Sequence, residues 1–238
     1  MGAIPSHPAA IRPDWLTDRL RACGALSDGR VTEIRWEPIG TGQVGDSARF
    51  HLTYDQAGAG PATVAGKFPA EDQNSRGTAA AFGLYSKEVG FYREIAPHLD
   101  VRVPQALVAE IAEDGVDFVL IFEDLGPARG GNQLASCSFV DAQAGLRQAA
   151  AMHGPSWNNP ALTGLDLLQP REGHAKQVKA LYGNAQAIFR ERYADSLEPE
   201  YMAICEELNE AKEEWFGRDS TDKAIVHGDF RLDNTLFD

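Results

Sequence analysis

The sequence has few cysteines, no long apolar run and no signal-peptide pattern, and each absence excludes a class of protein. Its three cysteines, Cys23, Cys137 and Cys205, lie far apart, in neither paired nor metal-ligand spacing, which argues against a disulfide framework and against zinc. No stretch approaches the ~20 apolar residues that span a bilayer, and the first residues lack the basic and apolar regions of a signal peptide. These absences predict a soluble, cytoplasmic protein that binds no membrane.

Basic residues are scarce relative to acidic ones. The chain holds 22 lysines and arginines against 35 aspartates and glutamates, a formal net charge of -13. Such a chain would repel a phosphate backbone instead of gathering it, so nucleic acid is excluded as a partner. With 238 residues, 43% of them hydrophobic, the chain is long enough to bury a core as one large domain or two smaller lobes.

Periodicity divides the chain into a β-rich part and a helical part. In the first half, period-2 alternation and short apolar runs predict strands at 31–36, 48–54, 63–68, 107–112 and 117–122, the last two joined by a turn at 113–115, and helices at 14–22 and 78–96. The second half shows helical patterns at 140–152, 173–194 and 198–216, with breaks at Pro155, Pro160 and Pro170, and a strand-like stretch at 224–226. We predict a bilobal α+β fold: an N-terminal antiparallel β lobe over residues 1–125 and a mostly helical C-terminal lobe over residues 126–238.

Three glycines, Gly40, Gly42 and Gly45, have the G-x-G-x-x-G spacing that serves both dinucleotide and kinase sites. A dinucleotide-binding fold would require a helix directly after Gly45, whereas an alternating, strand-like pattern follows here. Strand, glycine loop and strand predict a hairpin that lays backbone N–H groups over nucleotide phosphates. An ordinary glycine-rich turn remains an alternative for this segment.

Lys67 ends the sequence Val-Ala-Gly-Lys on a predicted strand, where protein kinases have Val-Ala-Ile-Lys and a lysine that grips the α- and β-phosphates. Glu88, on the next predicted helix, shares a helical stripe with apolar residues, namely Ala81, Leu84, Phe91 and Ile95. A carboxylate on a buried face needs a partner, so we predict an ion pair between Glu88 and Lys67 in the cleft between the lobes. The alternative is that Glu88 lies at the border of the apolar stripe and its carboxylate is exposed to solvent.

The segment 227–234, His-Gly-Asp-Phe-Arg-Leu-Asp-Asn, is the strongest signal in the sequence. It matches the kinase pattern in which Asn follows the catalytic Asp by five positions. In that chemistry Asp229 orients the attacking hydroxyl and accepts its proton, and Asn234 offers a neutral oxygen to Mg²⁺. Arg231, two residues after the base, would meet the γ-phosphate.

Three segments together, 227–234, Phe-Glu-Asp-Leu at 122–125 and Lys-Glu-Val-Gly-Phe-Tyr at 87–92, resemble the aminoglycoside phosphotransferase and ecdysteroid-kinase-like branch of the kinase superfamily. The resemblance covers nearly the whole chain. It implies a protein-kinase-like fold that uses ATP and Mg²⁺ to phosphorylate a hydroxyl of a small molecule.

The resemblance also implies roles for particular residues. The backbone of Glu123, Asp124 and Leu125 would read adenine, with Lys67 and Glu88 at the phosphates. A helical insertion between this hinge and the catalytic loop would hold the acceptor. The acid-rich segment 191–214 is either a solvated helix face or a wall that attracts a cationic acceptor. The oligomeric state is not predicted.

Two departures from the family pattern bear on activity. Gly66 replaces the usual aliphatic residue before the lysine, which softens that strand. The family also places a second metal-binding Asp on a strand after the catalytic loop, and Asp238 follows Asn234 too closely to substitute for it. We therefore expect a C-terminally truncated chain that transfers no phosphate, has low stability, and starts a strand at 235–237 whose antiparallel partner is missing. A nucleotide-binding pseudokinase is the alternative function.

Overall fold

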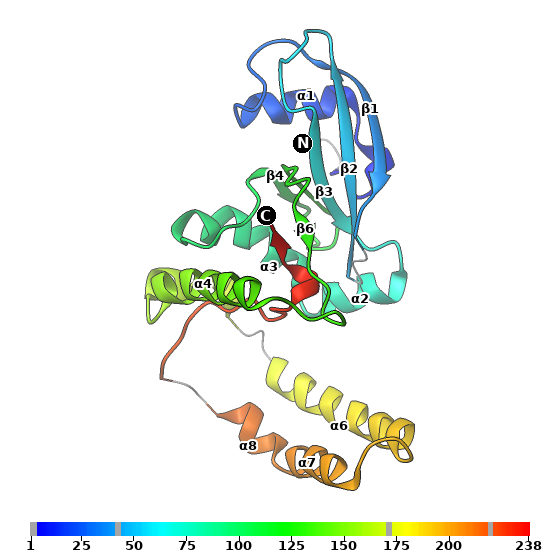
Figure 1. Cartoon of the computed structure of the whole chain (residues 1–238), viewed down its shortest axis with the longest axis vertical. Helices are drawn as coiled ribbons and strands as arrows, with labels where there is room; N and C mark the ends of the chain where they lie inside the picture. The colour runs from blue at the N-terminus through cyan, green and yellow to red at the C-terminus, as the bar shows by residue number, and fades with distance from the viewer. Residues whose placement is uncertain (1–3, 41–43, 170–172, 219–220) are drawn as a thin grey trace. The chain divides into compact units, whose positions relative to one another are not determined.

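The computed structural model describes residues 4–40, 44–169, 173–218 and 221–238 (Figure 1). The chain forms two compact units, one of residues 1–157 with 224–238 and the other of residues 158–223. The prediction that residues 1–125 and 126–238 form separate lobes stays a prediction.

Within the described residues a five-stranded antiparallel sheet dominates the first unit, in the order β1-β2-β3-β5-β4 (Figure 1). The strands are β1 (Val31–Pro38), β2 (Gly45–Tyr54), β3 (Thr63–Pro69), β4 (Ala106–Ile111) and β5 (Phe118–Glu123). All five lie where alternation and short apolar runs predict them, within three residues at each end. Strands β4 and β5 form the expected hairpin, in which Gly115 adopts a positive φ of 71° that favours glycine.

Alternation places an apolar layer on each face of the sheet. One layer joins Phe50, Val64 and Phe68 to Leu16 and Leu20 of helix α1 (Pro13–Ala22). The other layer contains Phe118, Leu120 and Phe122, with Tyr85 and Val89 of helix α3 (Leu84–Gly90). Lys67 on β3 is paired with Leu120, so it lies on the face of the second layer.

The helix expected at 78–96 is divided, and this prediction was wrong in its bounds. Helix α2 (Gln73–Ala81) starts earlier, because the Asp72 side chain accepts a hydrogen bond from Ser75 N–H and caps it. Gly83, at a φ of 64°, separates α2 from α3, which continues as a π-helical turn (Phe91–Ile95) and a 3-10 turn (Ala96–His98). This break resets the helical phase, so Ala81 and Leu84 of the predicted stripe are exposed.

Helix α4 (Phe139–Ser156) runs past the expected break at Pro155 and ends one residue later. The stretch 224–226 does not form a strand. Its Ile225 N–H donates to the hydroxyl of Ser156 and not to a neighbouring strand. The stretch therefore runs along the end of α4.

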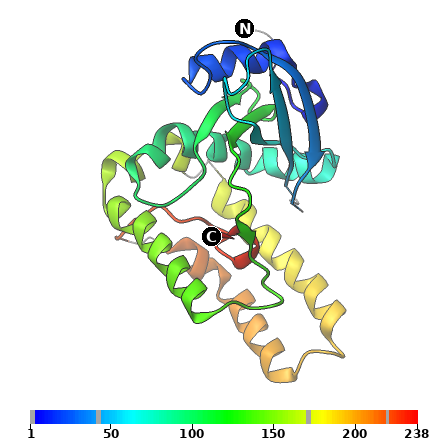
Figure 2. The same cartoon turned by 45° about the horizontal axis from the view of Figure 1, so that its top comes forward.

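The strand at the end of the chain does have a partner, contrary to expectation. Strand β7 (Leu236–Phe237) pairs antiparallel with β6 (Arg129–Gly130) (Figures 1 and 2). Phe237 is buried, and the guanidinium of Arg129 lies 4.9 Å from its ring centroid. The linker after β5 thus supplies the cover that sequence reasoning judged absent.

The second unit consists of helices. They are α5 (Pro160–Thr163), α6 (His174–Tyr193), α7 (Pro199–Glu210) and α8 (Lys212–Gly217), with a 3-10 turn at Asp166–Leu168. Helix α6 matches the prediction, whereas the predicted helix 198–216 is broken at Ala211. Lys179 pairs with Glu213 at 2.6 Å and joins α6 to α8. No helix among the described residues is long and apolar enough to cross a membrane.

Candidate active site

The glycine loop connects two paired antiparallel strands. β1 ends at Pro38, β2 begins at Gly45, and the Ile39 N–H donates to Ser47 O across the base of the loop at 2.9 Å. Gly40 adopts a φ of 72°. The predicted Gly42 lies outside the described residues. A strand and not a helix starts at Gly45, so the dinucleotide-fold alternative is wrong.

The backbone of Gly45 packs closely against β3. A Cβ there would lie 2.9 Å from the carbonyl oxygen of Phe68 and 3.2 Å from Cε of Lys67. The absent side chain therefore lets the start of β2 lie directly against the lysine. A phosphate chain held by the loop would find the ammonium group beside it.

Lys67 and Glu88 form the predicted ion pair. The distance from Nζ to Oε1 is 2.5 Å, and the two side chains are 34% and 29% exposed. Val89, next to Glu88, is fully buried, so the carboxylate lies at the edge of the core and not in open solvent. Burial, and then the charge of Glu88, raise the pKa of Tyr92, one helical turn further on.

Hydrogen bonds hold the end of β5 and the hinge in place. Glu123 N–H donates to Gln105 O at 3.0 Å, and Gln105 N–H donates to the Glu123 carboxylate at 2.8 Å. Within the described part of the chain, Leu125 accepts from Ala128 N–H at 2.9 Å while its own N–H has no partner. That N–H is a donor available to a ligand.

The carboxylate of Asp124 forms an ion pair with Arg49, a residue that sequence analysis missed. Nε of Arg49 lies 2.7 Å from Oδ2, and Nη2 lies 3.2 Å from Oδ1. Burial opposes ionisation of Asp124, but hydrogen bonds from Arg49 and from Gly126 N–H outweigh it and lower its pKa. Nothing in the local sequence around Arg49 indicates this contact.

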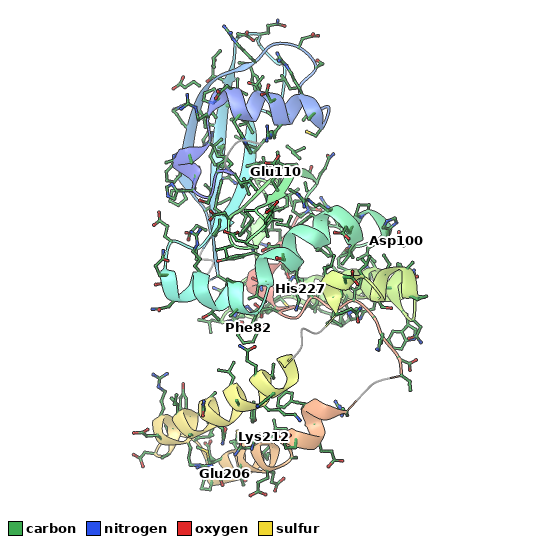
Figure 3. All side chains as sticks on the ribbon, turned by 180° about the vertical axis from the view of Figure 1, so that it is seen from behind. Phe82, Asp100, Glu110, Glu206, Lys212 and His227 are labelled. Carbon is green, nitrogen blue, oxygen red and sulfur yellow. The ribbon has the colours of Figure 1, made fainter. Side chains whose placement is uncertain are left out.

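The catalytic loop begins at His227, labelled in Figure 3, and gathers the three residues predicted for chemistry. Nδ2 of Asn234 donates to the backbone oxygen and to Oδ2 of Asp229, both at 2.9 Å. Nε of Arg231 lies 3.3 Å from the other carboxylate oxygen, Oδ1. Gly228, at a φ of 81°, turns the chain ahead of Asp229, whose side chain is 62% exposed. The carboxylate is therefore both oriented and accessible.

The linker that contains β6 holds this loop in place. Gly131 N–H donates to Thr235 O, and Gln133 N–H donates to Oδ1 of Asp233, both at 3.0 Å. A Cβ on Gly131 would collide with the backbone of Leu232. The Gly-Gly pair at 130–131 was the only sequence signal for this contact, because glycine permits close backbone approach.

Asn234 fits a role as a metal ligand. Its Nδ2 is used by Asp229, and its Oδ1 accepts no hydrogen bond from the described residues. Such an amide oxygen is a ligand type that Mg²⁺ accepts. Asp238 instead pairs with Arg102. In the described residues no three His, Cys, Asp or Glu side chains gather into a metal-binding group.

The site residues thus form two clusters, one on the sheet and hinge and one on the catalytic loop. No hydrogen bond or ion pair between the two is present among the residues that the structure describes. That Asp229 and Asn234 face the same nucleotide as Gly40 and Gly45 stays a prediction.

Comparison with models of known families identifies the family of this chain. A model of the phosphotransferase enzyme family, abbreviated APH, matches residues 55–238. Comparison with individually curated proteins gave no match. The five-stranded antiparallel sheet followed by a helical part is consistent with the kinase-like fold of that family. The chain belongs to the APH phosphotransferase enzyme family, a protein-kinase-like family.

Proposed function

We propose that the chain is an ATP-dependent kinase that phosphorylates a hydroxyl of a small molecule. The observation that carries the proposal is the catalytic loop, where Asn234 and Arg231 hold the carboxylate of Asp229 from both sides. Membership in a phosphotransferase family supports this reading of the loop.

The sheet cluster would hold the nucleotide. ATP supplies the phosphoryl group, Lys67 neutralises its phosphates, and Glu88 keeps the lysine in place at 2.5 Å. Backbone N–H groups of the loop from Gly40 to Gly45 would cover the phosphates. The N–H of Leu125 would bind the adenine edge.

The loop cluster would act on the acceptor. Asp229 would accept the proton of the attacking hydroxyl, and the hydrogen bond from Asn234 to Oδ2 orients its carboxylate. Arg231 lies against the other oxygen and carries a positive charge suited to the transferred phosphate. Mg²⁺ would neutralise the phosphates, held in part by Oδ1 of Asn234.

The helices of the second unit carry exposed acidic residues. Glu206 and Glu213 are engaged by Arg190 and Lys179. Other glutamates of α7 and α8 are exposed, namely Glu200, Glu207, Glu210 and Glu214. They favour an amine-bearing alcohol as a first class to test, with a purely solvated helix face as the alternative.

The test is to incubate the purified chain with Mg²⁺ and ATP labelled at the γ-phosphate. The acceptor panel contains aminosugars, amino alcohols and neutral sugars, and labelled products are separated from ATP. The expected result is transfer to one class that depends on both Mg²⁺ and acceptor. ATP binding without transfer to any member of the panel would favour a nucleotide-binding pseudokinase.

One observation favours that second function. The described carboxylates near the loop have other partners, since Asp233 accepts from Gln133 N–H and Asp238 pairs with Arg102. Asn234 would then hold the metal without a dedicated carboxylate, and a neutral ligand holds Mg²⁺ weakly. Mg²⁺-dependent transfer of phosphate to an acceptor therefore decides between the two functions.

A further inference from the structure

Arg49 connects the glycine hairpin to the hinge. Its guanidinium makes a two-point contact with Asp124, at 2.7 Å and 3.2 Å, and its Nη1 lies 3.8 Å from Glu37 on β1. The Asp124 side chain is only 10% exposed and that of Arg49 is 32% exposed. A fork-shaped contact with a nearly buried carboxylate is more restrictive than an exposed pair.

The contact lies on the face of the sheet that carries Lys67. Directly paired residues of antiparallel strands project to the same face. Arg49 pairs with Ala65 on β3, and Ala65 pairs with Phe122 on β5. Lys67, two residues after Ala65, shares that face. Arg49 thus crosses the small side chain of Ala65 to reach Asp124, two residues beyond Phe122.

The hinge backbone is shaped to receive the guanidinium. Gly126 N–H donates to Oδ1 of Asp124 at 3.0 Å and closes a turn around the carboxylate. A Cβ on Gly126 would lie 3.1 Å from Nη2 of Arg49. A larger residue at position 126 would therefore press against the contact.

We infer that Arg49 is a positioning residue for the nucleotide: through Asp124 it fixes the β1–β2 hairpin relative to the hinge. Gly40 and Gly45 belong to that hairpin. The contact therefore fixes the distance between the loop proposed to bind the phosphates and the hinge proposed to bind adenine. This inference rests on the proposed function, because it assumes that the hairpin and the hinge bind the same nucleotide.

The test compares Arg49→Gln, Asp124→Asn, the double variant and Arg49→Lys in the full chain. Hydrogen exchange of peptides from β1 and β2 is measured without ligand, and ATP affinity is measured by titration calorimetry with Mg²⁺. Arg49→Gln should speed exchange in the hairpin and weaken ATP binding about tenfold. The double variant should lose no more ATP affinity than either single variant, because each single variant already removes the contact between Arg49 and Asp124. Arg49→Lys keeps the positive charge but not the two-point contact, so its ATP affinity should lie between those of wild type and Arg49→Gln.

Arg19→Gln is the matched control. Arg19 also makes a two-point contact with a half-buried carboxylate, Glu110 on β4, at 3.0 Å and 3.4 Å (Figure 3 labels Glu110). Its loss should lower the melting temperature but leave ATP affinity within about twofold of wild type.

The outcomes separate the inference from the proposed function. The inference alone would be overturned if the wild-type chain binds ATP and Arg49→Gln binds it equally well. It would also be overturned if Arg49→Gln does not speed hydrogen exchange in the hairpin. A wild-type chain that binds no ATP would overturn the proposed function and the nucleotide role of Arg49 with it. An equal loss of affinity in Arg19→Gln would show a general stability effect and overturn the specific role.

Discussion

Lys67 on β3 and Glu88 on α3 are joined by an ion pair of 2.5 Å, across a separation of 21 residues in the chain. The pair links the strand that follows the glycine hairpin to the helix packed against the sheet. Its side chains are about one-third exposed, which leaves the ammonium group open to a ligand. This arrangement leads to the first prediction.

Lys67→Met should weaken ATP binding at least about tenfold, because a phosphate contact is lost. Its effect on the free energy of unfolding should be about 1 kcal/mol or less, since solvent screens a partly exposed pair. Calorimetry and thermal melting measure the two effects. Lys179→Met, which breaks a comparable 2.6 Å pair with Glu213, should leave ATP affinity unchanged. Equal losses in the two variants would contradict a phosphate role for Lys67.

Asp229→Asn should lower phosphate transfer by at least about 100-fold, because the amide cannot accept the proton of the acceptor hydroxyl. ATP affinity should stay within about twofold, since Asp229 faces the acceptor in the proposal. Transfer of labelled phosphate measures the first effect and calorimetry the second. Asp195→Asn, an exposed change in the second unit, is the control. Near-normal turnover of Asp229→Asn would show that Asp229 is not the catalytic base.

Asn234→Ala should raise the Mg²⁺ concentration needed for half-maximal ATP binding by about tenfold. The removed amide donates the hydrogen bond that orients Asp229, and in the proposal its oxygen would bind Mg²⁺. Asp238→Asn should leave the Mg²⁺ requirement unchanged, because Asp238 pairs with Arg102. A Mg²⁺ titration of ATP binding compares the variants. A higher requirement in Asp238→Asn would instead make Asp238 a metal ligand.

Gly66→Ala should destabilise the fold by about 1–3 kcal/mol, because the strand has no room for a methyl group. A Cβ at this position would lie 2.7 Å from Cε2 of Phe50, 3.0 Å from Cε2 of Phe68 and 3.2 Å from Cδ1 of Ile121. Denaturant unfolding measures the loss. Gly77→Ala, in α2 with no atom near the added Cβ, should be neutral or stabilising. A stable Gly66→Ala variant would mean that the rings can move apart.

The stability contributed by Asp124 should depend on pH. Its pKa lies below the ordinary value of 3.8, since hydrogen bonds from Arg49 and Gly126 outweigh burial. The ionised carboxylate therefore stabilises the fold above pH 3.8, and this contribution is lost as pH falls through the lower folded-state value. The difference in Tm between wild type and Asp124→Asn should be constant between about pH 5 and 7 and shrink in acid. A difference that persists unchanged in acid would contradict an ionised Asp124.

Local patterns in the sequence were sufficient for the strands and for the order of the motifs. Period-2 alternation and short apolar runs located β1 to β5, because a strand with one buried face alternates and a strand buried on both faces is apolar throughout. The spacing in 227–234 brought Asp229, Arg231 and Asn234 together, since a short loop can close over so few residues. The pairing of Lys67 with Glu88 was also foreseen, because a carboxylate beside a buried face requires a cation.

Other features depended on contacts between distant residues, which only the tertiary structure decided. Gly83 reset the phase of α3, so the buried stripe differed from the one read along a continuous helix. The β6–β7 pairing brings together residues about a hundred positions apart, and two-residue strands carry no periodic signal. The contact of Arg49 with Asp124 crosses an intervening strand. It follows from strand order and register, and neither is encoded in the residues next to Arg49.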